Sequence, residues 1–256
     1  MSAEIFDEVS VYYDLLYRDK PYKREAQYLN ELIARYAPNA KTIVDLGCGT
    51  GRHDWLLAEF DYNIVGIDQS ETMLEIARRG NGLDPAYPPT FRKGNLTDFS
   101  VDSKVDVVLS LFDVMSYLTS YSEFKAALGR VRAGLKLGGI FIFDCWYAPA
   151  VHNHRPAPKV RRLESDTVSL VRVTSPEFDA AKNVVRILYD VFVTPQDSQS
   201  TRHFQEHHEV RCFFEEELVE LLAGFGFRPL FQSKWFSDEA PNLDTWSALY
   251  GFECVS

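Results

Sequence analysis

One short stretch constrains the fold of this chain more than any other feature. The segment "TIVDLGCGTGRH", residues 42–53, passes from an apolar β-strand pattern into three glycines at every second position, and then into a helical pattern. Glycines at such a turn let the backbone approach a ligand closely, and the N–H groups at the start of the helix face that ligand. The stretch therefore predicts a βα unit that holds a ligand above its turn.

The spacing of these glycines, Gly47, Gly49 and Gly51, does not fit two common kinds of site. A dinucleotide fingerprint, GxGxxG, requires a glycine at position 52, which is Arg52 here. A P-loop requires Gly-Lys followed by Ser or Thr, and no such triplet follows. The turn alone thus indicates a ligand site of neither type.

Strand and helix patterns alternate from residue 42 to residue 146. Five apolar runs predict strands at residues 42–47, 63–68, 90–95, 104–111 and 139–146. Helical periodicity and capping residues predict helices at residues 20–37, 51–60, 70–80 and 122–135. Because this alternation is typical of βαβ units, we expect a parallel sheet.

The pattern changes after residue 146. A proline-containing loop is predicted at 147–158, antiparallel strands at 167–175, 183–194 and 202–214, a helix from 214 to the glycines of 224–226, and final strands at 228–236 and 245–254. The predicted fold class is α/β: a Rossmann-like, seven-stranded, mostly parallel sheet with helices on both faces, and an antiparallel β insertion between its fifth and sixth strands. The core would comprise residues 1–146 and 214–256, and the insertion residues 147–213.

Charge and composition exclude several classes of protein. The net charge of −10 disfavours a nucleic-acid or anionic-membrane partner, and no apolar run approaches the roughly 20 residues that a membrane helix needs. The four cysteines are far apart with no CxxC, so we expect buried thiols and no metal site. With no secretory signal pattern at the start, these features predict a cytoplasmic protein.

Polar side chains after two further strands narrow the ligand. Asp68 ends the second predicted strand, 21 residues after Gly47, and a carboxylate there accepts hydrogen bonds from both hydroxyls of a ribose. Asn95 and Leu96 follow the third strand, where an amide oxygen and an apolar side chain suit the amino group and the ring of adenine. These positions predict an adenosine-containing ligand.

The combination resembles the class I S-adenosylmethionine-dependent methyltransferases. The matching motifs are "VDLGCGTG", "GIDQSETMLEIA", "GNLTDF" and "VVLSLFDVMSYL", which lie between residues 40 and 145, and "GFGFRPL…WSALYGF" near the end. One departure is Asn95, where many relatives have Asp. The resemblance implies S-adenosylmethionine as cofactor and these cofactor-binding residues: Tyr13, Tyr22, Gly47, Cys48, Gly49, Gly51, Asp68, Gln69, Met73, Asn95, Leu96 and Phe112.

A narrower resemblance is to nucleotide-sugar amino N-methyltransferases of deoxysugar pathways. It is carried by "VYYDLLYRDKPYKREAQYL", "GTGRH", "SYL" and "RHFQEHHEVRCFFEEEL". In that group N-terminal tyrosines close over the cofactor, and an antiparallel insertion covers a small-molecule substrate. By resemblance Tyr13, Tyr17 and Tyr22 are candidates for this lid, with Tyr17 on the substrate side.

Methyl transfer to an amine needs a neutral nitrogen, and transfer to a hydroxyl needs a proton acceptor. Candidates for that role are His208, by its place in the resembled motif, Asp113, and Tyr117 as an orienting group. Alternation along a strand puts His208 on the same face as Glu206, whose carboxylate would orient the imidazole. The same alternation puts His203 on the opposite face.

The insertion is richer in basic residues than the rest of the chain. Residues 151–211 hold nine Lys or Arg against eight Asp or Glu. Arginine suits the diphosphate of a sugar nucleotide, and an aromatic ring stacks on a base or a sugar. The predicted substrate-binding residues are Tyr17, Trp146, Arg172, Arg186 and His203.

The sequence thus predicts a methyltransferase that acts on an amino or hydroxyl group of a small molecule, with a nucleotide-linked aminosugar as the first choice. Another small acceptor, such as a glycine-like amine or a natural-product hydroxyl, is the alternative. A tRNA- or protein-modifying enzyme fits less well, because the charge is acidic and no NPPY-type motif is present. A non-catalytic cofactor-binding protein is disfavoured by the intact glycine turn, and the exposed insertion suggests a homodimer.

Overall fold

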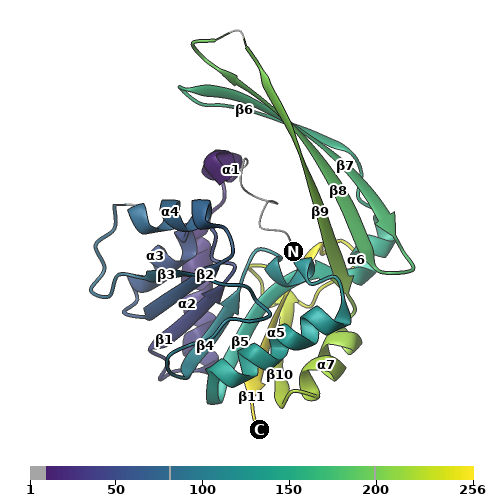
Figure 1. Cartoon of the computed structure of the whole chain (residues 1–256). Coiled ribbons are helices and arrows are strands. Elements are labelled where there is room, and N and C mark those ends of the chain that lie inside the picture. The colour runs from purple at the N-terminus through teal and green to yellow at the C-terminus, as the bar shows by residue number, and fades with distance from the viewer. Residues whose placement is uncertain (1–9, 81, 199) are drawn as a thin grey trace.

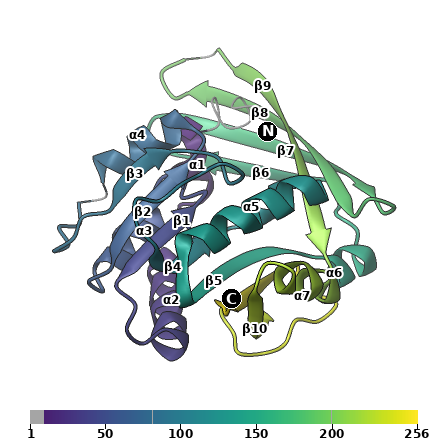
Figure 2. The same cartoon turned by 60° about the horizontal axis from the view of Figure 1, so that its bottom comes forward.

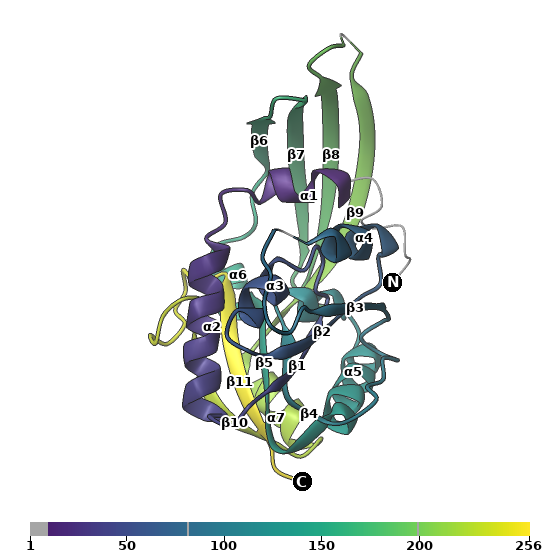
Figure 3. The ribbon, with the colours of Figure 1, turned by 90° about the vertical axis from the view of Figure 1, so that its left-hand side faces the viewer.

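The computed structural model describes residues 10–80, 82–198 and 200–256. Figure 1 shows a layered α/β core, above which a long curved antiparallel sheet rises from one side. Helix α1 lies beneath this second sheet, between it and the core (Figures 1 and 3). The molecule therefore has two walls that face one another.

The core sheet has seven strands in the order β3-β2-β1-β4-β5-β11-β10. Its strands are β1 (Thr42–Leu46), β2 (Asn63–Asp68), β3 (Thr90–Lys93), β4 (Val105–Ser110), β5 (Leu135–Tyr147), β10 (Phe227–Lys234) and β11 (Ser247–Cys254). Strands β1 to β5 run parallel, whereas β11 is antiparallel to both β5 and β10. The predicted seven-stranded, mostly parallel sheet is confirmed.

Helices cover both faces of this sheet, as its two-sided apolar strands require. The helices of the described residues are α1 (Ser10–Leu16), α2 (Tyr22–Tyr36), α3 (Arg52–Ala58), α4 (Glu71–Arg79), the 3₁₀ turn η1 (Val114–Tyr117), α5 (Tyr121–Gly134), α6 (Ala148–Asn153) and α7 (Glu215–Ala223). Figure 2 shows α5 and α7 together on one face, and Figure 3 shows α2 on the other. Ser70 caps α4, since its Oγ accepts a hydrogen bond of 3.3 Å from the Met73 N–H.

The second sheet contains β6 (Lys159–Glu164), β7 (Val168–Asp179), β8 (Val184–Pro195) and β9 (Arg202–Phe213), all antiparallel. It joins the core sheet where β9 pairs with the end of β5 over two residue pairs. The antiparallel insertion between the fifth and sixth core strands is therefore confirmed. Its treatment as a separate unit at residues 147–213 stays a prediction.

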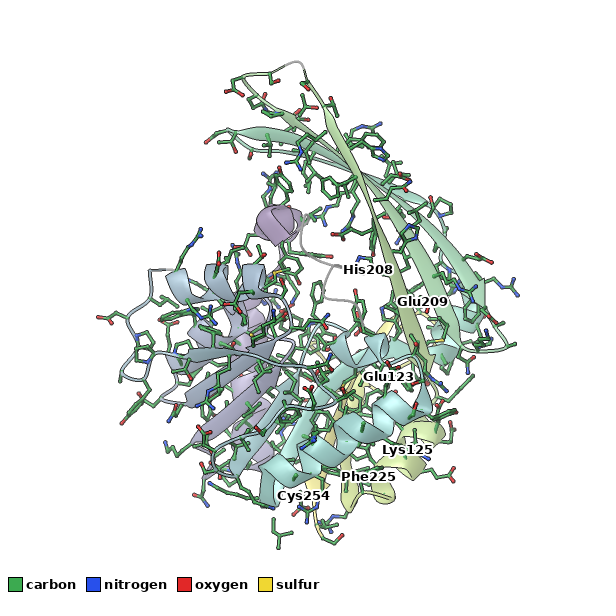
Figure 4. All side chains as sticks on the ribbon, viewed as in Figure 1. Glu123, Lys125, His208, Glu209, Phe225 and Cys254 are labelled. Atoms are coloured by element: carbon green, nitrogen blue, oxygen red, sulfur yellow. The ribbon has the colours of Figure 1, made fainter. Side chains whose placement is uncertain are left out.

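The two faces of the second sheet differ in composition. Its inner face packs Leu170 and Val191 against Leu16 of α1 in one buried apolar cluster. Strand register puts Glu206 and His208 on this same face, as alternation predicts, and Figure 4 shows His208 on the side of β9 that faces the core. The opposite face carries exposed polar side chains, among them Glu209.

Three details differ from the predictions. Strand β6 was not predicted, because its sequence "KVRRLE" is charged; it is an edge strand, where charges oppose aggregation. Helix α6 lies in the predicted loop, where Pro149 occupies the first turn that tolerates proline. Strand β7 continues through Pro176, which lies beyond Thr174, the last β7 residue that pairs with β6. The missing N–H of this proline therefore removes no hydrogen bond between β6 and β7.

Candidate active site

A cavity of about 250 Å³ lies between the carboxyl ends of the core strands, α1 and the inner face of the second sheet. Most of the predicted site residues line it: Tyr13, Tyr17, Tyr22, Gly47, Cys48, Gly49, Asp68, Gln69, Met73, Leu96, Phe112, Asp113, Tyr117 and Trp146. They come from positions spread between residues 13 and 146. The fold therefore brings together residues that the motifs named separately.

The three glycines of the turn have different surroundings. All have positive φ, at 77°, 56° and 69° for Gly47, Gly49 and Gly51, which glycine adopts without strain. A Cβ at Gly47 would collide with Val114, and one at Gly51 would collide with Phe91. At Gly49, no described atom lies within 4 Å of the position of a Cβ, which would project into the cavity. Gly49 thus forms the floor of the cavity, whereas Gly51 lies outside its lining and permits packing below it.

Asp68 stands beside this floor. Its Oδ2 accepts a hydrogen bond from the Gly49 N–H and its Oδ1 accepts one from the Ser70 N–H, both at 2.9 Å. Burial raises the pKa of this carboxyl, although the backbone donors oppose the shift. Since an ionised carboxylate offers about four acceptor positions, it retains capacity for a ligand hydroxyl.

Asn95 is placed differently from its neighbour Leu96. Leu96 lines the main cavity, whereas Asn95 lines a second, adjoining one. The Asn95 Oδ1 accepts hydrogen bonds from the Thr97 N–H and hydroxyl, at 3.1 and 3.0 Å. The amide oxygen that was predicted to meet an adenine amino group is therefore engaged within its own turn.

The N-terminal tyrosines close one side of the cavity. The rings of Tyr13 and Tyr17 lie 4.7 Å apart, and Tyr17 meets the ring of Phe112 edge-on at 4.8 Å. Burial raises the pKa of Tyr13 well above its usual value, so it stays a phenol. Asp14 on the same helix accepts a hydrogen bond from Thr50 and pairs with Arg52, so α1 is tied to the glycine turn.

A chain of hydrogen bonds backs the opposite wall. The Tyr117 hydroxyl lies 2.9 Å from Nδ1 of His208, and Nε2 of His208 lies 3.1 Å from Oε2 of Glu206. Tyr117 lines the cavity, while His208 is not among the described residues that do. The predicted contact between the Glu206 carboxylate and the His208 imidazole is present, but the Tyr117 phenol lies between the imidazole and the cavity.

Asp113 occupies a strained turn at the end of β4. Both Phe112 and Asp113 have left-handed φ values, 70° and 61°. Ser247 Oγ lies 2.8 Å from Asp113 Oδ1 and 3.0 Å from Asp144 Oδ2. Burial raises the pKa of Asp113 well above its usual value, and the nearby Asp144 raises it further. The Trp146 side chain also donates to Asp113, so this carboxyl has two side-chain donors.

Three predicted substrate residues belong to the second sheet, and the structure separates them. Arg172 lies on the inner face with its guanidinium 4.7 Å from the ring of Tyr189, which lines the cavity. Arg186 pairs with Glu209 at 3.1 Å, and His203 pairs with Asp190 at 2.9 Å. Both of these contacts lie on the outer face. The structure does not bring Arg186 or His203 to the cavity.

Several lining residues were not predicted. Ile187, Tyr189 and Val210 come from β8 and β9 and form the wall that the second sheet contributes. Tyr189 pairs in register with Glu206, so it shares a face with His208. Once the strand register is known, the alternation of side chains along β8 places Tyr189 on the inner face of the sheet.

These features fit a ligand that contains a ribose and a flat apolar base. The floor at Gly49 admits a ligand directly onto backbone, Asp68 offers acceptors, and Met73 and Leu96 supply apolar walls. The fold and the cavity define a Rossmann-like α/β protein with its site at the carboxyl edge of the sheet.

Comparison with known proteins identifies the family. A model described as a methyltransferase domain matches residues 43–139. The chain is 30% identical over 229 residues to dTDP-3-amino-3,6-dideoxy-alpha-D-glucopyranose N,N-dimethyltransferase of Streptomyces fradiae, covering 88% of this chain and 85% of the relative. It is 29% identical over 220 residues to dTDP-3-amino-3,4,6-trideoxy-alpha-D-glucopyranose N,N-dimethyltransferase of Streptomyces venezuelae, covering 84% and 88%.

A solved structure shows the same fold. It is a S-adenosylmethionine-dependent methyltransferase from Clostridium acetobutylicum, with a TM-score of 0.80 at 22% identity over 96% of this chain and 97% of that one. The chain belongs to the S-adenosylmethionine-dependent methyltransferases and is an enzyme that uses this cofactor. Within the described residues, no helix has the length and apolar character to cross a membrane.

Proposed function

We propose that this enzyme methylates the amino group of a nucleotide-linked sugar. The observation that carries the proposal is a single cavity with two walls: the glycine turn and Asp68 on one side, and Tyr117, Tyr189 and Trp146 on the other. Both relatives named above methylate amino groups of dTDP-linked deoxysugars, according to their names. The match extends over more than four fifths of the chain, including the second sheet.

The cofactor, when bound, supplies an electrophilic methyl group on a sulfonium. Gly47, Gly49 and Asp68 would hold its aminoacyl and ribose parts, and Leu96 its base. The remaining work of the protein is to position the acceptor nitrogen and to exclude water, which together supply much of the acceleration in such displacements. The tyrosines of α1 and the inner face of the second sheet serve both purposes.

Arg172 is the proposed contact for the diphosphate. A guanidinium fork binds phosphate oxygens in two parallel hydrogen bonds, and stacking on Tyr189 fixes its plane. Arg161 faces Arg172 in register on β6 and so lies on the same inner face. Two cations on this face suit a dianionic group that enters beneath the second sheet.

A transfer assay across paired acceptors tests the function. Amino and hydroxy forms of the same dTDP-deoxysugars are incubated with the enzyme and S-adenosylmethionine, and products are read by mass. Methylation of the amino form with little transfer to the hydroxy form is expected. Transfer to the hydroxy sugar, or to simple amines alone, would replace this proposal with one of the other small-molecule acceptors.

The role of the nucleotide has its own control. The same aminosugar without nucleotide should react with a much higher KM, and Arg172→Gln should raise KM for the nucleotide sugar but not for the free sugar. Glu177→Gln, on the same strand at an exposed position, serves as the matched surface variant.

We also propose that residues 147–213 act as a substrate cover, and that the enzyme is a cytoplasmic homodimer. Four unpaired cysteines support a reducing compartment, and the exposed outer face of the second sheet supports self-association. Sedimentation at micromolar concentration would report the dimer; a monomer mass there would contradict it.

A further inference from the structure

The hydrogen-bond chain behind the acceptor wall has a definite direction. Its three members are Tyr117 on η1 and His208 and Glu206 on β9, with separations of 2.9 and 3.1 Å. His208 and Glu206 are 3% and 7% exposed, so neither exchanges partners with bulk water easily. Only Tyr117 of the three lines the cavity.

The chemistry of each group fixes where the protons lie. An ionised carboxylate only accepts, so Nε2 of His208 must carry the hydrogen that points to Glu206. In the neutral imidazole Nδ1 is then an acceptor, and the Tyr117 hydroxyl donates to it. Burial raises the pKa of Tyr117 well above its usual value, so the phenol keeps the hydrogen that it donates.

The surroundings of His208 favour this arrangement. Tyr189 on β8 meets the imidazole edge-on at 4.9 Å, and the guanidinium of Arg172 on β7 lies 4.7 Å from the centre of the Tyr189 ring. Among the described residues, Glu206 is the anionic group in hydrogen-bond contact with the imidazole, and Tyr117 lies between the imidazole and the cavity. The arrangement resembles a carboxylate–imidazole pair aimed at a hydroxyl, with the hydroxyl in the site.

We propose that Tyr117, His208 and Glu206 form a proton relay, in which Tyr117 is the catalytic residue that meets the acceptor amine and His208 and Glu206 are positioning residues that act through it. This inference rests on the proposed amine acceptor. It assigns to Tyr117 the contact that the sequence suggested for His208.

An acceptor ammonium gives a proton to the Tyr117 oxygen while the Tyr117 hydrogen passes to Nδ1 of His208. The resulting imidazolium is paired with the Glu206 carboxylate through Nε2–H. The nitrogen lone pair is then free to form the new C–N bond, for which the bound cofactor would supply the methyl group, and its sulfur would keep the electron pair of the broken carbon–sulfur bond.

The tautomer of His208 gives a test that needs no turnover. Nitrogen-15 NMR of the protein, with His208→Asn to assign the signals, should show hydrogen on Nε2 at neutral pH. In Tyr117→Phe the Nδ1 signal should move, because its donor is lost. Hydrogen on Nδ1 in the wild type would overturn the relay.

Kinetics give the second test. Tyr117→Phe should lower kcat on the order of 100-fold while cofactor affinity stays within twofold. Tyr121→Phe, at a half-exposed position nearby, should keep wild-type kcat. A kcat for Tyr117→Phe within threefold of the wild type would overturn the catalytic assignment.

The pH dependence of kcat distinguishes a positioning role of Glu206 from a purely structural one. Glu206→Gln keeps an acceptor for Nε2–H but loses the charge, so the acidic limb of the kcat profile should move down by about one pH unit while the plateau falls. Glu209→Gln on the outer face is the matched control. If Glu206→Gln lowers the plateau of kcat but leaves the acidic limb of the profile at the same pH, the positioning role of Glu206 is overturned.

The two proposals fail in different ways. If the wild type methylates none of the nucleotide aminosugars, the proposed function is overturned, while the NMR spectrum still decides the tautomer on which the relay depends. If transfer occurs but the limb and tautomer contradict the scheme, the function stands and the relay is overturned.

Discussion

Asp68 is the residue on which cofactor binding should depend most. Its carboxylate is held by the Gly49 and Ser70 N–H groups at 2.9 Å, which fixes it at the cavity wall. Asp68→Ala removes that acceptor and leaves both donors unpaired, so we expect a loss of S-adenosylmethionine affinity of at least about 30-fold, or roughly 2 kcal/mol. Titration calorimetry measures it, with exposed Asp84→Ala as the control. Unchanged affinity would contradict the ribose assignment.

Gly49 allows steric fit to be separated from backbone strain. Gly49 and Gly138 both have positive φ, 56° and 77°, and at neither would a Cβ meet a described atom within 4 Å. Alanine at either position should cost about 1 kcal/mol of folding stability through strain. Only Gly49 lines the cavity, so only Gly49→Ala should also weaken cofactor binding. Parallel thermal melts and calorimetry compare the two variants, and equal losses of affinity would refute the floor assignment.

At the scale of elements, α1 couples the second sheet to the cofactor site. Its seven residues are too few to be helical alone, so docking through buried Leu16 must hold it. Leu16→Ala should release the helix and displace Tyr13, which costs about tenfold in cofactor affinity, equivalent to about 1.4 kcal/mol. Hydrogen exchange should rise over α1 but not over β1. Exposed Val160→Ala is the control, and unchanged exchange over α1 would argue against the coupling.

The helices and strands also show which parts of the structure can be predicted from sequence patterns. The apolar runs predicted the central strands β1, β4 and β5 because burial on both faces leaves a continuous signal. Strand β6 was not predicted, because an edge strand needs few apolar residues. Helix α6 was not predicted, because prolines occur both in loops and in the first turns of helices. The alternation of side chains along a strand predicted that Glu206 and His208 share a face. No sequence pattern could place the Tyr117 phenol between these two residues and the cavity, because Tyr117 and His208 are 91 residues apart in the sequence.

At the scale of the whole molecule, two buried carboxyl pairs should shape the pH dependence of stability. Burial raises the pKa of Asp45 to about 6 and that of its partner Asp54 well above its usual value. Burial likewise raises the pKa of Asp144 to about 6, beside Asp113. The folded state thus keeps protons that the unfolded chain releases near pH 4. The stability they contribute is complete below about pH 4 and is lost as pH rises through 6.

Asp54→Asn should reveal this loss. An amide at position 54 donates to the Asp45 carboxylate and replaces the shared proton, so the variant should gain stability over the wild type as pH rises from 5 to 8, by on the order of 2 kcal/mol. The comparison between variants is needed because burial lowers the pKa of His53, which adds stability as pH rises toward about 6.5 in both proteins and is complete above that pH. The pKa of Glu25 is lowered to about 2, so this residue changes the stability only below about pH 4.5.

Denaturant unfolding at pH 5 and pH 8 measures the difference in stability between Asp54→Asn and the wild type, with exposed Asp84→Asn as control. A stability difference between Asp54→Asn and the wild type that does not change with pH would show that the buried pair holds no extra proton.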